Sequence, residues 1–271
     1  MPLREEFSRT GNFVFRWRSY LPVLMIVLIL LAMKDFEYPG HSEKLDQLWE
    51  IFCLIVSLSG LVIRIVTIGY TPKGTSGTNT RSQIADVLNT TGMYSVTRNP
   101  LYLGNFIIWF GISMFPRLWW FSLIVILIFW LYYERIIFTE EEFLRKKFGA
   151  LYLKWAEKTP VLIPNFKNWE SSKMSFSFRK MLKNEYKSFF AMIVSYMVIE
   201  MLGDVFVRHK LELDMMWLVI LSVSSAFYLF IRILKKKQVC WMLREDERLL
   251  SWKRRLSQLS ELFIKSIILN R

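Results

Sequence analysis

The chain has 271 residues, of which 53% are hydrophobic and 16% aromatic, and its mean hydropathy is +0.28. This composition indicates a membrane protein and excludes a disordered chain, which requires low hydrophobicity. Two cysteines are too few for a disulfide-stapled secreted scaffold. The net charge of +13 would suit a nucleic-acid-binding domain. Such domains seldom devote half of their residues to hydrocarbon, so we expect no nucleic-acid partner.

Six segments are apolar enough to be read as membrane-spanning helices, each of which needs about 20 mostly apolar residues. In chain order, the predicted spans are 17–33, 48–70, 101–115, 118–138, 189–207 and 215–231. The first span follows a basic leader with no convincing cleavage site, so we expect an uncleaved anchor. Only Pro116 and Arg117 separate the third span from the fourth, which predicts a tight antiparallel hairpin. The predicted fold class is all-α, a polytopic integral membrane protein with about six transmembrane helices.

The basic residues are distributed as this topology requires. With a cytoplasmic N-terminus, 30 of the 36 Lys and Arg residues fall on the cytoplasmic side and 5 on the other, with Arg64 inside the second span. Because positive charge accumulates in cytoplasmic loops, both termini are predicted to be cytoplasmic, with anionic lipid headgroups as partners of the basic face. The chain is divided into a leader with the first span (1–47), a core (48–166), a linker with the last two spans (167–234) and a basic tail (235–271).

Cytoplasmic amphipathic helices are expected beside the spans. Thr139, followed by three glutamates at 140–142, has the pattern of a helix N-cap with acids in the first turn. The spacing of the apolar residues that follow predicts an amphipathic helix through Trp155 at the membrane interface. The tail from Lys235 has the same character.

Polar side chains gather where the third span begins and where the fourth ends. Because the predicted hairpin is antiparallel, these two places share one membrane face. The polar positions are Tyr94, Arg98, Asn99, Tyr102 and Asn105 at the entry, and Glu134, Arg135, Glu140, Glu141 and Glu142 at the exit. His41 and His209 are assigned to the opposite side, and no P-loop, dinucleotide-binding motif or Cys/His metal cluster occurs, so no metal is expected.

An ordered set of motifs resembles a known family. It runs from Gly92-Met93-Tyr94 through Arg98-Asn99-Pro100-Leu101-Tyr102-Leu103-Gly104 and the hairpin to Glu140-Glu141 and the closing prolines Pro160 and Pro164. Over roughly residues 48–166, it is similar to the integral-membrane isoprenylcysteine carboxyl methyltransferase and phospholipid methyltransferase superfamily. The resemblance implies a methyltransferase that uses S-adenosyl-L-methionine, with the cofactor enclosed on the cytoplasmic side. Asn99 stands where the family most often has histidine.

Roles for individual residues follow from the resemblance and from the charges. The predicted cofactor-binding residues are Tyr94, Arg98, Asn99, Pro100, Tyr102, Leu103, Gly104, Asn105, Glu140 and Glu141. Arg98, Arg135 and Glu140 are the predicted catalytic residues. Arg64, Arg135 and Glu200 are predicted to contact the substrate, because a charge inside a span is a functional candidate. With Asp204 and Arg208, Glu200 would form a charged stripe on the fifth span, for which an ion-paired packing contact is the alternative.

The residue types favour an anionic methyl acceptor. Asn99 cannot take up a proton near neutral pH, whereas a phosphate or carboxylate oxygen needs no base to become nucleophilic. We therefore expect O-methylation of a membrane lipid. Residues 74–80 and 88–95 resemble a bacterial branch related to lipid A 1-phosphate O-methyltransferases, which makes that phosphate the favoured acceptor and the bacterial inner membrane the expected location. The alternatives are a prenylated cysteine carboxylate, an ethanolamine amine, or a non-catalytic scaffold or transporter that binds anionic lipids.

Overall fold

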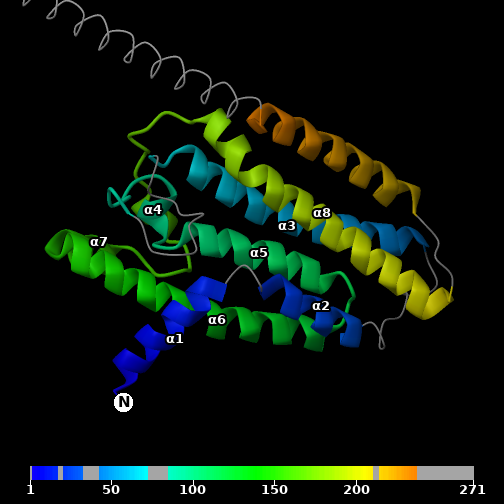
Figure 1. Ribbon diagram of the computed structural model, residues 1–271, viewed down its shortest axis with the longest axis horizontal. Coiled ribbons are helices and arrows are strands. Elements are labelled where there is room, and N and C mark those ends of the chain that lie inside the picture. Colours follow the sequence, from blue (N-terminus) through cyan, green and yellow to red (C-terminus); the bar gives the residue numbers. More distant parts are fainter. Residues whose placement is uncertain (1, 18–20, 33–42, 73–84, 210–213, 237–271) are drawn as a thin grey trace, which may run out of the picture. The chain divides into compact units, whose positions relative to one another are not determined.

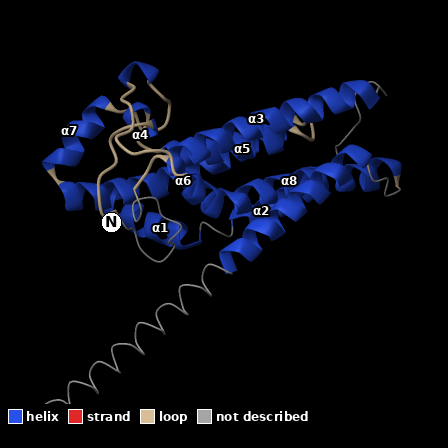
Figure 2. Cartoon of the chain, turned by 90° about the horizontal axis from the view of Figure 1, so that it is seen from above, coloured by secondary structure: helices blue, strands red, loops and turns tan. Residues whose placement is uncertain are grey.

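A computed structural model of the chain describes residues 2–17, 21–32, 43–72, 85–209 and 214–236. Within these ranges, all regular elements are helices (Figures 1 and 2). The chain forms two compact units, Met1–Ser224 and Ser225–Arg271, and the labelled helices belong to the first. The four-part division of the sequence stays a prediction, and the tail beyond residue 236 lies outside the described residues.

Four described helices are long and apolar enough to cross a membrane: Leu45–Gly69, Trp119–Phe148, Phe178–Phe206 and Met215–Lys236. They overlap the second, fourth, fifth and sixth predicted spans and support a polytopic all-α membrane protein. The first and third predicted spans fall on shorter helices, α2 (Leu21–Ala32) and α5 (Pro100–Met114). The 15 residues of α5 rise only about 22 Å, less than the roughly 30 Å of a hydrocarbon core. Within the described residues, helix length therefore supports four spans, and the prediction of six is not confirmed.

The helix α6 (Trp119–Phe148) differs most from expectation. It is one continuous helix of 30 residues that includes the fourth predicted span and the start of the predicted amphipathic helix. Thr139 begins no helix, because its hydroxyl donates to the Arg135 carbonyl one turn earlier and its backbone stays helical. The chain breaks instead at Gly149, whose φ of 53° favours glycine, and α7 (Ala150–Lys158) follows. The prediction of an N-cap at Thr139 is wrong.

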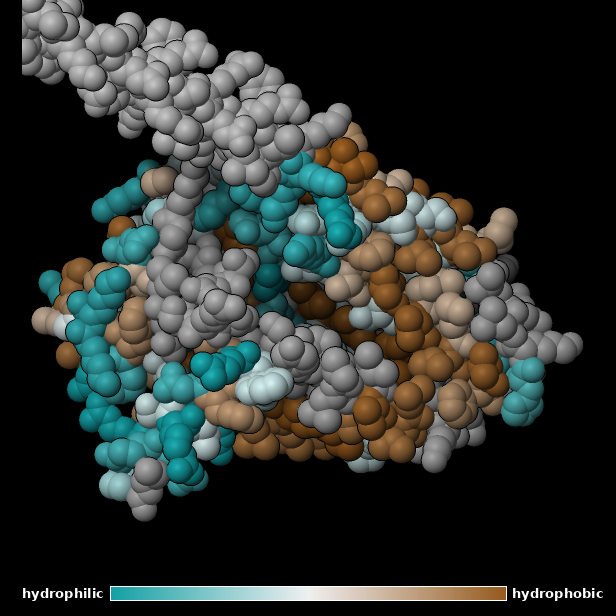
Figure 3. All heavy atoms as spheres, in the orientation of Figure 1, coloured by the Kyte–Doolittle hydropathy of each residue, from teal (hydrophilic) through white to brown (hydrophobic). Residues whose placement is uncertain are grey.

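Part of the predicted leader forms α1 (Leu3–Trp17), which packs against α6. The Tyr132 hydroxyl donates to the Val14 carbonyl at 3.0 Å, and Arg4 pairs with Glu142 at 2.6 Å. In Figure 3, hydrophobic residues dominate the visible face over α5, α6 and α8, and hydrophilic residues gather towards α7. The polar loops therefore lie at one end of an apolar helical body.

A close backbone approach joins α3 (Glu43–Gly69) to α5. A β-carbon added to Gly60 would lie 2.6 Å from the Gly104 carbonyl oxygen, and one added to Gly104 would lie 2.7 Å from the Gly60 carbonyl oxygen. The helix α8 (Phe178–Arg208) packs against both helices, and its Tyr196 hydroxyl donates to the Cys53 carbonyl at 2.8 Å. Small residues let membrane helices approach closely, so the two glycines set the spacing of α3 and α5.

We predict that Gly60→Val destabilises the protein by about 1–3 kcal/mol, because the new side chain would collide with the α5 backbone. Thermal unfolding in detergent would measure the loss. Ser59→Val adds similar bulk at an exposed position of the same helix and should leave the midpoint nearly unchanged. Equal effects from the two substitutions would contradict the assigned role of the close approach.

Candidate active site

The site is built where two distant segments cross beside α4 (Met93–Val96). The Arg98 amide donates to the Pro160 carbonyl at 2.9 Å, and the Asn165 amide donates to the Val96 carbonyl, also at 2.9 Å. Further along, the Gly92 amide donates to the Glu170 carbonyl at 2.8 Å. These backbone hydrogen bonds hold residues 158–170 against residues 92–99. The second of these segments leads into α5, and the first begins at the end of α7.

Side chains reinforce this crossing. The Thr97 hydroxyl is fully buried and lies 3.1 Å from the Leu162 carbonyl oxygen and 3.3 Å from that of Val161. The Asn99 amide donates to the same Val161 carbonyl at 3.0 Å. The indole of Trp155, on α7, donates to the Tyr94 carbonyl at 3.1 Å. The Asn99 amide therefore stabilises the contact between the two segments, a role that the motif alone did not indicate.

An ion pair joins the two ends of the hairpin. The Nη1 atom of Arg98 lies 3.0 Å from Oε2 of Glu141, and their side chains are 16% and 24% exposed. Tyr152 on α7 is 3% exposed, and burial together with the Glu141 carboxylate raises the pKa of its phenol. The phenol is therefore protonated at neutral pH and can donate a hydrogen bond.

Three buried polar atoms of this group have unused hydrogen-bonding capacity. Arg98 Nε, Glu141 Oε1 and Tyr152 Oη make no hydrogen bond of ordinary geometry within the described part of the chain, although the Tyr152 phenol lies close enough to Glu141 and Arg98 for both to affect its pKa. Buried polar atoms are nearly always hydrogen-bonded, so two donors and one acceptor gathered here indicate a place for a polar ligand. Arg98 also lines a cavity of about 570 Å³ with residues 156–161 and 163–165, a volume in the range of small-molecule sites.

Glu140 contacts a different partner. The Tyr102 hydroxyl donates to Glu140 Oε1 at 2.7 Å, and the rings of Tyr102 and Tyr133 lie 4.8 Å apart. Burial and the nearby Glu140 carboxylate raise the pKa of the Tyr94 phenol, which therefore stays neutral. The two glutamates thus contact successive polar residues of the same hairpin arm, Glu141 at Arg98 and Glu140 at Tyr102.

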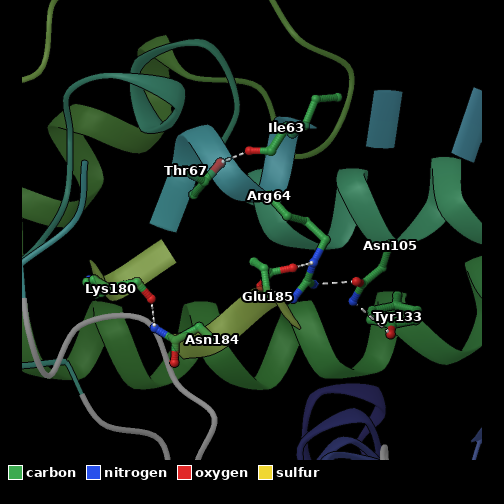
Figure 4. Close-up of polar contacts among 8 residues, drawn as sticks. All are labelled: Ile63, Arg64, Thr67, Asn105, Tyr133, Lys180, Asn184 and Glu185. Atoms are coloured by element: carbon green, nitrogen blue, oxygen red, sulfur yellow. Dashed lines mark hydrogen bonds and ion pairs between the residues drawn. The ribbon is translucent and has the colours of Figure 1, made fainter. Parts of the chain in front are cut away.

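Further along α3, the Arg64 guanidinium donates three hydrogen bonds to two side chains (Figure 4). Its Nε and Nη2 atoms donate to the two carboxylate oxygens of Glu185 at 2.8 and 2.7 Å, and its Nη1 atom donates to Asn105 Oδ1. The Asn105 amide in turn donates to the Tyr133 hydroxyl at 3.4 Å. Arg64, a predicted substrate contact, is therefore already paired inside the protein.

Two other predicted site residues lie elsewhere. Arg135 faces α1, where its guanidinium carbon lies 4.7 Å from the centre of the Phe7 ring. It lies about 140° around the helix from Glu140, because each residue turns an α-helix by about 100°. Glu200 lies beside Glu50, about 22 Å along α8 from Glu185. The structure brings neither residue to the Arg98–Glu141 pair.

The remaining predicted residues are part of the helix entry. Pro100 is the first residue of α5, Leu103 is buried, and Gly104 faces α3 rather than a cavity.

His209 follows the last residue of α8 and has a φ of 52°, and His41 lies outside the described residues. Asp204 is buried on α8, whereas the side chain of Arg208 is not among those described.

Sequence reasoning missed Glu185 and did not assign Tyr152 to the site. Glu185 stands in a basic segment just before the fifth predicted span, and Arg64 is a lone cation inside the second. The need of a buried arginine for a carboxylate was the available signal, but it does not say which carboxylate. Tyr152 lies within residues 48–166, over which the family resemblance runs, and only the tertiary contact places its hydroxyl near Glu141.

Apolar helices of spanning length indicate an integral membrane protein, and a polar cavity lies at their ends. Residues 51–150 match the family model of phospholipid methyltransferases, a match that covers 100 of the 271 residues. The nickel-cobalt-cadmium resistance protein NccN of Alcaligenes xylosoxydans xylosoxydans is 27% identical over 157 residues, which cover 57% of this chain and 66% of that protein. No solved structure matches. The described residues contain no group of three or more His, Cys, Asp or Glu placed to hold a metal.

We predict that Thr97→Val, which keeps the shape of the side chain, loosens the crossing by about 1–2 kcal/mol because it removes a buried donor from two carbonyls. Hydrogen exchange of residues 158–165 should accelerate. Thr67→Val removes a hydroxyl that bonds only within its own helix and should leave this segment protected. Unchanged exchange in Thr97→Val would contradict the assigned role.

Proposed function

We propose that this protein transfers a methyl group from S-adenosylmethionine to an anionic oxygen of a membrane lipid. The observation that carries the proposal is the Arg98–Glu141–Tyr152 group, with its three buried polar atoms lacking partners inside the family-matched hairpin and α7. The adjacent cavity supports it, because it provides room for a small molecule next to Arg98.

The residues present fit this cofactor. Its methionine part carries a carboxylate and an ammonium group, and its sulfonium carries a positive charge. Arg98 would hold the carboxylate, because guanidinium donors match carboxylate oxygens. The free oxygen of Glu141 would accept from the ammonium group, and the Tyr152 phenol would donate one further bond. When bound, the cofactor supplies an activated methyl group.

The chain's own contribution is binding, orientation and exclusion of water. A phosphate oxygen is anionic at neutral pH, so methylation of it requires no proton acceptor. The surroundings agree with this, because the pKa values of Tyr94 and Tyr152 are raised and both phenols keep their protons. Lys158 also lines the cavity and would attract an anionic acceptor.

Among anionic acceptors, lipid A 1-phosphate is the one that the sequence resemblance favours. Six spans, cytoplasmic termini and location in the bacterial inner membrane belong to the same proposal. A prenylated cysteine carboxylate and an ethanolamine amine are the alternatives within the same chemistry. A scaffold or transporter that only binds anionic lipids is the alternative outside it, and cofactor binding separates the two classes.

Purified protein in detergent should bind S-adenosylmethionine saturably, measured by isothermal titration calorimetry. Arg98→Ala and Glu141→Gln should each weaken binding by about 10- to 100-fold, because each removes a charge-assisted hydrogen bond. Glu142→Gln is the matched control, since this neighbouring glutamate pairs with Arg4 on α1 and should keep its affinity. Absence of binding by folded wild-type protein would overturn the proposed function.

The acceptor can be identified by mass spectrometry of total lipids from cells with and without the gene. We expect a phosphate-bearing lipid heavier by one CH₂ unit only in cells that have the gene, and not in cells that carry Glu141→Gln instead. A mass increase restricted to ethanolamine lipids would refute O-methylation and favour transfer to nitrogen.

A further inference from the structure

The helix α8 lies beyond the family-matched residues 51–150, yet it supplies the carboxylate that balances Arg64 inside that segment. We propose that Glu185 is a positioning residue for the methyl-transfer site and acts through Arg64 and Asn105. This inference rests on the proposed function and extends the site to a helix outside the family match.

The geometry around Arg64 leaves its guanidinium little freedom. Glu185 is 3% exposed and accepts two parallel hydrogen bonds, an arrangement that fixes the plane of the guanidinium as well as its position. The stem of Arg64 lies against α5, since a β-carbon on Gly104 would be only 2.5 Å from Arg64 Cγ. The remaining terminal nitrogen therefore points at Asn105.

The guanidinium determines which way the Asn105 amide faces. A guanidinium has only donors, so the amide must turn its oxygen towards Arg64 and its nitrogen towards Tyr133, as Figure 4 shows. The Tyr133 hydroxyl consequently accepts from Asn105. Without Arg64, nothing in these contacts would distinguish the two orientations of the amide.

Asn105 belongs to a row of polar residues that leads to the cofactor pocket. Tyr102 and Asn105 are three residues apart and share one face at the start of α5, and Arg98 lies in the segment that leads into this helix. The Tyr133 ring contacts Tyr102, whose hydroxyl binds Glu140 next to Glu141. A series of contacts therefore runs from Glu185, through Arg64 and the residues just named, to Glu140, which is adjacent in sequence to Glu141 of the Arg98–Glu141 pair.

A purely stabilising role makes a different prediction. Replacing both members of a buried ion pair with apolar residues is often neutral for stability, whereas removing one member leaves a buried charge and destabilises. We therefore expect the double variant Arg64→Leu/Glu185→Leu to unfold near the wild-type temperature but to bind S-adenosylmethionine about tenfold more weakly. Glu185→Gln should show the same loss of affinity with a lower unfolding temperature, and Glu185→Asp should recover part of it.

The Arg117–Asp46 pair at the other end of α3 is the matched control, because its side chains are similarly buried. Asp46→Asn should lower the unfolding temperature and leave the affinity for S-adenosylmethionine unchanged. The inference is overturned if Glu185→Gln and the double variant bind like the wild type, or if Asp46→Asn weakens binding as much as Glu185→Gln. Absence of binding by the wild-type protein would instead remove the proposed function, and this inference with it.

Discussion

The contact on which the other arrangements depend is the meeting of the α3 and α5 backbones at Gly60 and Gly104. Because neither residue carries a β-carbon, the two helices approach closely enough for the stem of Arg64 to lie flat against α5. That position delivers the guanidinium to Asn105 on one side and to the α8 carboxylate on the other. A wider spacing would leave a charged group in an apolar interior without its hydrogen bonds, at a cost of several kcal/mol.

Two arginine–glutamate pairs in this protein are bonded to different extents. Arg64 uses its guanidinium on Glu185 and Asn105, and both oxygens of Glu185 accept from it. The Arg98–Glu141 pair has one hydrogen bond and leaves a donor and an acceptor buried without partners in the described chain. The Arg64–Glu185 contact is therefore closed, whereas the Arg98–Glu141 pair keeps polar atoms for further hydrogen bonds.

Hydropathy and motif order predicted the apolar helices and brought the two polar ends of the hairpin to one face, where Arg98 meets Glu141. They did not predict that α6 continues through Thr139, because a threonine can bond back to its own helix as readily as it can cap a new one. Glu185 was not predictable either, since it has no periodic pattern and its partner lies 121 residues away. Arg135 was assigned to the site by proximity in sequence, whereas its angular position on α6 directs it to α1.

The unbroken course of α6 has a consequence for where a methyl acceptor can be reached. Residues 119–138, which are apolar or aromatic apart from Ser122, Glu134 and Arg135, rise about 30 Å, which matches the thickness of a hydrocarbon core. With that stretch in the bilayer, Glu140 and Glu141 stand only about 3–5 Å beyond the acyl chains, at the level of lipid headgroups. Under the proposed function, the oxygens of lipid headgroups come within range of the Arg98–Glu141 pair at this depth, and groups deep among the acyl chains do not. The position of the site along the bilayer normal would therefore limit which acceptor groups can reach it, independently of the side chains that bind them.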